Sequence, residues 1–135
     1  MGSFSDTPAL LSGGDIYPYR FVKVSTAADD TGLQATASSE TLLGVSDAST
    51  NGFNSDYHAQ AGQPITLQGG NIVLVIAAGN ITRGAFVQAD SNGKAVTAVT
   101  TAGTRAFQGY VALQSATAGL IVRCYKIGSF VTYPV

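Results

Sequence analysis

The chain has 135 residues, of which 45% are apolar and 11% are charged. That length and composition allow one domain with a hydrophobic core and leave little room for a second domain. The formal net charge of -1 gives no field that would attract nucleic acid or an anionic membrane. A single cysteine, Cys124, excludes an internal disulfide framework and a zinc site built from cysteines. We therefore expect one compact unit that is stabilised by packing or by assembly.

The first residues differ in composition from the rest of the chain. Residues 1–14 mix small polar side chains with Pro8 and end in two glycines, Gly13 and Gly14. This composition is typical of an irregular terminal segment. The sequence thus predicts a flexible N-terminal arm over residues 1–14 and a single β-rich domain over residues 15–135.

No targeting signal is visible at the N-terminus. A basic stretch followed by an apolar one is missing, and Asp6 stands where a myristoylation signal needs Ser or Thr. The longest apolar run, residues 72–78, is far shorter than the roughly 20 residues that span a bilayer. We expect synthesis in a cytoplasm and no membrane partner.

Strand patterns begin directly after the arm. Residues 17–25 alternate with a period of two and are rich in aromatic and β-branched side chains, which predicts a first strand. A similar alternation follows at residues 33–38. The short apolar run at residues 42–45 is of the buried type, and it precedes a turn-rich stretch at residues 46–55.

The middle of the chain predicts two hairpins. In the first, residues 64–68 and 72–76 flank a Gly-Gly pair, and in the second, residues 85–89 and 94–99 flank Asn92-Gly93. Such pairs suit tight primed turns, because these turns need positive φ angles.

Two further strands, over residues 106–113 and 120–127, complete the domain. No segment carries a long apolar pattern of helical period. Eight to ten short strands with frequent turns predict an all-β fold, either a small sandwich or a partly open barrel of antiparallel strands.

Residues suited to catalysis are few. His58 is the only histidine, and a lone histidine on a short strand is more often a surface or hydrogen-bonded residue than a general base. The sequence Gly44-Val45-Ser46-Asp47-Ala48 resembles a nucleophile elbow, but a loop follows it where a helix is needed. We expect no enzyme, no catalytic residues and no cofactor.

Two loops have side chains that bind hard cations in other proteins. Asp47, Asn51, Asn54 and Asp56 could surround calcium, and turn formation by the same side chains is the alternative explanation. The stretch from Asp90 to Lys94 begins like a calcium loop, but a hairpin turn accounts for it better because the later ligands are missing. We expect no bound metal. Cys124 is expected to be a small buried core residue.

The C-terminal half carries several motifs in a characteristic order. They are Ala77 to Val87, with the pattern Ala-Gly-x-Ile-x-x-Gly-x-x-Val, then Gly93-Lys94-Ala95-Val96, Gly109-Tyr110-Val111-Ala112, and the run from Tyr125 to Tyr133. This arrangement resembles the head-decoration, or capsid cement, proteins of tailed bacteriophages over about residues 65 to 133. The resemblance does not extend to residues 26–62, whose topology it leaves open.

The resemblance implies a structural protein of the virion that binds the outer capsid surface as a homotrimer. Its partners would be the major capsid protein and copies of itself, and an N-terminal arm would become ordered on the capsid. Such a protein cements capsomers against internal pressure and needs no active site. The candidate arm contacts with the capsid are Ser3, Phe4, Thr7, Leu10 and Leu11. The candidate trimer contacts are Tyr17, Tyr19, Phe21, Phe130 and Tyr133.

A carbohydrate- or receptor-binding β-module of a fibre or adhesin is the alternative. Such modules present aromatic platforms or clusters of polar loop residues. The candidates for that role are Phe53 and Tyr57, beside Asp56 and His58.

Overall fold

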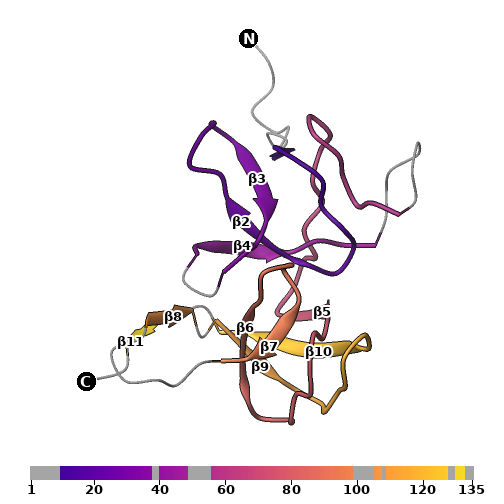
Figure 1. Ribbon diagram of the computed structural model, residues 1–135, viewed down its shortest axis with the longest axis vertical. Coiled ribbons are helices and arrows are strands. Elements are labelled where there is room, and N and C mark those ends of the chain that lie inside the picture. Colours follow the sequence, from indigo (N-terminus) through magenta and orange to yellow (C-terminus); the bar gives the residue numbers. More distant parts are fainter. Residues whose placement is uncertain are drawn as a thin grey trace.

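The computed structural model describes residues 10–37, 40–48, 56–98, 105–107, 109–127 and 130–132. Within these residues the chain forms 11 strands and no helix, arranged in three sheets (Figure 1). None of the described residues therefore belongs to a helix that is long and apolar enough to cross a membrane. The expected all-β class is confirmed, and the sheets do not close into a barrel.

The first sheet comes from the N-terminal half of the chain and lies in the upper part of Figure 1. Its strands are β1 (Leu11–Ser12), β2 (Phe21–Val24), β3 (Thr31–Gln34) and β4 (Leu42–Val45), in the order β1-β3-β2-β4. Strand β1 runs parallel to β3, and the other pairs are antiparallel.

The second sheet comes from the C-terminal half and is antiparallel throughout. Its strands are β5 (Ile72–Ile76), β6 (Phe86–Ala89), β7 (Ala95–Thr97), β9 (Tyr110–Ala112) and β10 (Ile121–Lys126), in the order β5-β10-β9-β6-β7. One parallel bridge between Ala77 and Ala95 joins the two edges of this sheet at one point. The sheet is therefore strongly curled but open along most of its edges.

A two-stranded ribbon extends the β9–β10 hairpin. It consists of β8 (Arg105–Phe107) and β11 (Phe130–Thr132), with Phe107 opposite Phe130. Figure 1 shows this ribbon to one side of the second sheet.

One hydrophobic core joins the first and second sheets. Phe21 of β2 and Tyr110 of β9 are both fully buried, with their ring centroids 5.0 Å apart. Around them the buried side chains of both sheets form one continuous cluster: Ala35, Val45, Val73, Val75, Ala77, Ile81, Val87, Ala89, Ala95, Ala112, Val122 and Cys124. Since most of these residues are valine or alanine, the two large rings fill much of the space between the sheets.

The opposite face of the first sheet is also covered. Val22 points away from Phe21 and packs in a separate cluster with Ile16, Ala59 and Ile65. Adjacent strand residues point to opposite faces, so the burial of both Phe21 and Val22 means that β2 is enclosed on two sides.

The turn between β6 and β7 connects the two sheets. Gly93 accepts a hydrogen bond on its carbonyl oxygen from the Phe21 amide at 2.8 Å, and an Arg20 guanidinium nitrogen donates to the Asn92 carbonyl at 3.0 Å. Gly93 has φ +71, and a Cβ atom there would lie 2.8 Å from Cγ of Gln34. A side chain at this position would therefore push the sheets apart.

The first predicted strand, over residues 17–25, is too long. Strand β2 begins only at Phe21, because Tyr19 has φ 59 and the chain turns there. A non-glycine residue in this left-handed region interrupts a strand, whatever the alternation of the side chains around it.

The predicted hairpin between residues 64–68 and 72–76 is wrong. Strand β5 pairs with β10, whereas residues 64–68 lie beside the first sheet, where the Ile65 amide donates to the Leu10 carbonyl. The side chain of Gln68 takes the place of a neighbouring strand: its amide nitrogen donates to the Leu74 carbonyl at 2.7 Å, and its oxygen accepts from the Leu74 amide at 2.8 Å.

The second predicted hairpin is confirmed, with a different turn. Strands β6 and β7 are antiparallel neighbours. Gly93 has a positive φ and Asn92 does not, so the connection is a three-residue loop rather than a primed two-residue turn. The Asp90 carboxylate accepts hydrogen bonds from the amides of Asn92 and Lys94 and stabilises this loop.

Residues 10–14, which belong to the predicted flexible arm, lie against the first sheet. The Leu11 amide donates to the Asp30 carbonyl at 2.9 Å, and the Ser12 amide donates to the Gln63 carbonyl at 2.8 Å. Strand β1 thus lies between β3 and residues 62–65. Its short, glycine-flanked sequence did not reveal these partners, because main-chain pairing needs no periodic apolar pattern.

Candidate functional site

Ser46 and His58, the two residues whose side chains could act in catalysis, form hydrogen bonds with backbone groups instead. Ser46 is fully buried; its hydroxyl donates to the Tyr17 carbonyl at 2.7 Å and accepts from the Arg20 amide at 3.0 Å. His58 is 1% exposed; its Nε2 accepts from the Thr66 amide at 2.9 Å, and its Nδ1 lies 3.1 Å from the Ala48 carbonyl. These contacts make His58 a buried hydrogen-bonded residue that links two loop segments.

Cys124 lies in the core, as the sequence predicts. Burial raises the pKa of its thiol to about 12, so the reactive thiolate is scarce at neutral pH. Burial, with a smaller contribution from Cys124, likewise raises the pKa of Tyr110 to about 12. Both groups therefore behave as packing residues.

The candidate calcium loop lies partly outside the described residues, which include Asp47 and Asp56 but not Asn51 and Asn54. The Asp47 carboxylate accepts a hydrogen bond from the Ala48 amide at 2.8 Å. In the described part of the chain, no three His, Cys, Asp or Glu residues lie close enough to hold a metal ion.

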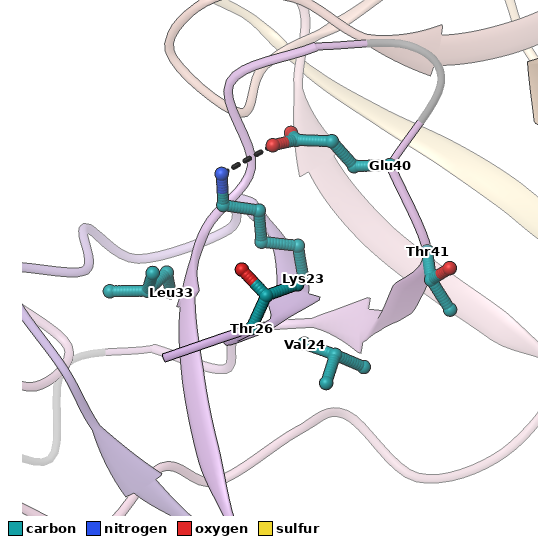
Figure 2. A pocket seen from close by; sticks show the side chains of 6 residues that line it. All are labelled: Lys23, Val24, Thr26, Leu33, Glu40 and Thr41. Atoms are coloured by element: carbon teal, nitrogen blue, oxygen red, sulfur yellow. Dashed lines mark hydrogen bonds and ion pairs between the residues drawn. The ribbon is translucent and has the colours of Figure 1, made fainter. Parts of the chain in front are cut away.

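A pocket of about 400 Å³ lies on the first sheet, between residues of β2 and β3 and the residues just before β4. Its lining residues, shown in Figure 2, are Lys23, Val24, Thr26, Leu33, Glu40 and Thr41. Lys23 and Glu40 form an ion pair on its wall, and each side chain is 20% exposed. Val24, Leu33 and the carbon chain of Lys23 give the pocket an apolar wall on which an apolar side chain could pack.

Hydrogen bonds hold the Glu40 carboxylate in place. One oxygen accepts from the amides of Thr36 and Ala37 at 2.6 and 2.7 Å, and the other accepts from Lys23. Burial raises the pKa of Glu40, but these hydrogen bonds outweigh burial and leave its pKa below the ordinary value. The ion pair thus fixes the loop that borders the pocket.

A second surface feature is a pair of tyrosines. The rings of Tyr17 and Tyr57 lie 4.9 Å apart at an angle of 34°, and the Arg20 guanidinium lies 5.1 Å from the centre of the Tyr17 ring. A hydrogen bond with Tyr17 raises the pKa of Tyr57. Of the candidates for a carbohydrate platform, Tyr57 is partly exposed and His58 is buried, while Phe53 lies outside the described residues.

The outer side of the second sheet carries a group of exposed apolar side chains. A cross-strand row runs from Phe86 through Val111 and Tyr125 to Ile72, across four neighbouring strands. Phe86, Tyr125 and Ile72 are 42, 41 and 46% exposed. Neighbouring strands lie about 4.8 Å apart, so this row is about 14 Å long.

Further apolar side chains extend this row on the same side of the sheet. They are Leu74, Ile76, Leu113 and Ile121, with Arg123 among them, and together with the row they are called the apolar face below. This face was not predicted from the sequence. The alternation of Ile121, Arg123 and Tyr125 with the buried Val122 and Cys124 is the signal that could have located it.

The predicted contact residues lie in different surroundings. Tyr17 is exposed and Tyr19 is partly exposed, but Phe21 is completely buried in the core and cannot contact another chain. Phe130 lies on the ribbon strand β11. Of the candidate arm contacts, Leu11 is 41% exposed and Leu10 packs against the cluster around Val22. Ser3, Phe4, Thr7 and Tyr133 lie outside the described residues.

No protein-family model matches the sequence. A comparison with curated proteins finds no similar sequence. Among solved structures, the fold is similar to that of the N base of head fiber gp8.5 in bacteriophage phi29. The two chains are 18% identical, and the TM-score is 0.64 over 87% of this chain and 90% of that chain. At this identity the similarity establishes the shared fold.

Proposed function

We propose that this chain is a structural protein of a tailed-phage virion that binds the outer capsid surface as a homotrimer and cements neighbouring capsomers. It acts by binding rather than by catalysis, and its partners are the major capsid protein and copies of itself. It is made in the host cytoplasm and incorporated into the head.

The observation that carries this proposal is the fold shared with a phage head fiber base over 87% of the chain. That protein is the base of a bacteriophage head fiber, and the shared fold covers most of both chains rather than one motif. The sequence motifs that resemble cement proteins lie mainly in the second sheet, so they support the same role independently.

The surface of the domain suits a binding role. The apolar face offers several large side chains, among them Phe86 and Tyr125, which are 42 and 41% exposed. Aromatic and aliphatic side chains of this kind supply most of the free energy of binding at protein interfaces. We propose in addition that the N-terminal residues before β1 add main-chain hydrogen bonds to an exposed strand of the capsid protein. Ser3, Phe4 and Thr7 are the arm residues proposed for that contact.

Mixing the purified protein with undecorated, expanded heads tests the proposal directly. We expect cryo-electron micrographs to show density at three-fold or quasi-three-fold positions of the outer surface, and decorated heads to resist heat better than bare ones. Unchanged heads after incubation with excess protein would contradict the proposal.

A second candidate function is carbohydrate or receptor binding, which the Tyr17–Tyr57 pair favours. The two neighbouring tyrosine rings beside Arg20 can contact the apolar face of a sugar ring. A glycan array with the native protein and with Tyr57→Ala distinguishes the two functions. Binding that is lost in Tyr57→Ala would support the carbohydrate function, whereas no binding to any glycan would leave the capsid role as the better explanation.

A further inference from the structure

The charges of this chain are divided between its two ends. Residues 1–68 contain seven acidic and two basic side chains, and residues 69–135 contain one acidic and five basic side chains. The formal charges of the two halves are therefore -5 and +4, although the whole chain carries only -1. Since the first sheet is built from the first half and the second sheet from the second, the molecule has an acidic end and a basic end (Figure 1).

The apolar face lies at the basic end. Arg123 is its one charged residue among the described side chains, and it lies between Leu74 of β5 and Leu113, which directly follows β9. If two copies joined through this same face, the two arginines and the surrounding positive charge would be brought together. Like charges at an interface oppose association, so the face is suited to a different, acidic surface.

The acidic end offers such a surface at the β2–β3 hairpin. Val24 is 40% exposed at the end of β2, and Asp29 and Asp30 are exposed in the turn that follows. We call these three residues the acidic tip. Val24 also lines the pocket of about 400 Å³ that Figure 2 shows, together with Leu33 and the stem of Lys23. The tip thus combines negative charge with an apolar recess.

We propose that the apolar face of one copy binds the acidic tip and its recess on a second copy, in a head-to-tail contact. An apolar side chain of the face enters the recess, while Arg123 approaches Asp29 and Asp30. This proposal rests on the self-association in the proposed function and assigns the surfaces that perform it. A head-to-tail contact uses two different surfaces of each chain. Both surfaces of every chain are occupied only when the chains close into a ring, as in a trimer.

The test exchanges charges between the two surfaces and uses purified protein without heads. Arg123→Glu and Asp29→Lys each put a like charge at the contact, and the double variant restores an opposite pair. Arg83→Glu is the matched control, because Arg83 is exposed at the same basic end but lies outside the apolar face. Sedimentation velocity over a concentration series, at low and high salt, measures the association, and thermal melts check that each variant folds.

We expect the wild type and Arg83→Glu to associate alike, and both to dissociate as salt is raised. Each single variant should weaken association by about tenfold or more, and the double variant should recover most of it. A monomeric wild type, unaffected single variants, or a double variant no better than the singles would overturn the proposal. Because no capsid is present, these results are independent of whether the protein binds heads. The two single variants lie on opposite ends of the molecule, so the misfolding of one leaves the other as a test.

Discussion

Single residues at the joint between the sheets determine how closely the sheets approach. Gly93 combines a φ of +71 with contacts that leave no room for a Cβ atom, since the Phe21 and Ala35 carbonyl oxygens would lie 3.2 and 3.3 Å from it. Both the backbone conformation and the space at this position therefore require glycine.

We expect Gly93→Ala to lower the free energy of unfolding by about 2 to 4 kcal/mol, from backbone strain and crowding together. Gly119→Ala is the control, because Gly119 has a similar φ of +86 but nothing within 4 Å of the added atom. Urea denaturation of both variants separates the two contributions. Equal losses in the two variants would show that contact with the first sheet contributes nothing.

The lowered pKa of Glu40 makes the free energy of unfolding depend on pH. Its pKa lies below the ordinary value of 4.5 in the folded chain, because hydrogen bonds from Lys23 and the loop amides outweigh the effect of burial. The folded state therefore binds the proton less readily than the unfolded state, so this stabilisation is complete above pH 4.5 and is lost as the pH falls through the lowered pKa.

Denaturation curves from neutral pH to about pH 3 should show this loss in the wild type. Glu40→Gln should already be less stable at neutral pH and should lose less stability on acidification. Parallel curves for the two proteins would show that the Lys23–Glu40 pair does not contribute to the acid response.

At the scale of elements, the sequence predicted strands better than their partners. Strand β4 occupies the predicted residues 42–45, and β5 fills the predicted run 72–76. The Gly-Gly pair before β5 nevertheless failed to make a hairpin. The residues of the turn do not reveal that the Gln68 side chain forms hydrogen bonds with the Leu74 backbone. Nor do they reveal that β10, about 50 residues later, provides the neighbouring strand.

The candidate site shows the same limit. Ser46, His58 and Cys124 could be judged unsuited to catalysis from the sequence, but their actual partners are backbone groups or core atoms that only the fold brings near. The apolar face is made of residues from four strands, and no single stretch of the sequence contains it.

Truncations from the N-terminus test the role of β1. Removing residues 1–9 should leave the fold intact, because β1 begins at Leu11. Removing residues 1–14 should cost about 2 to 4 kcal/mol, since several main-chain hydrogen bonds to Asp30, Gly32 and Gln63 are lost.

Circular dichroism and thermal melts measure the folding and stability of both truncated proteins. A head-binding assay shows whether the protein that lacks only residues 1–9 has lost the proposed capsid contact. If the two truncated proteins melt at the same temperature, β1 contributes nothing to the domain.

At the scale of the whole molecule, the two sheets have opposite charges and yet share one core. Phe21 of the first sheet packs on Tyr110 of the second, and the apolar cluster continues through both. If one sheet unfolded alone, the apolar surface that it covers on the other sheet would be exposed to water, which is unfavourable. The two sheets should therefore unfold together. We therefore expect the described domain to unfold in a single transition.

Phe21→Ala tests this expectation. The substitution should lower the free energy of unfolding by about 3 to 5 kcal/mol, and native-state hydrogen exchange should show the same loss of protection at β2 and at β10. Val22→Ala is the control, because Val22 lies on the same strand but points into the separate cluster around Ile16 and Ile65. Its smaller cost should be concentrated in the first sheet. If Phe21→Ala reduced protection in the first sheet and left β10 unchanged, the two sheets would be independent units, and the shared core would not account for the stability of the second.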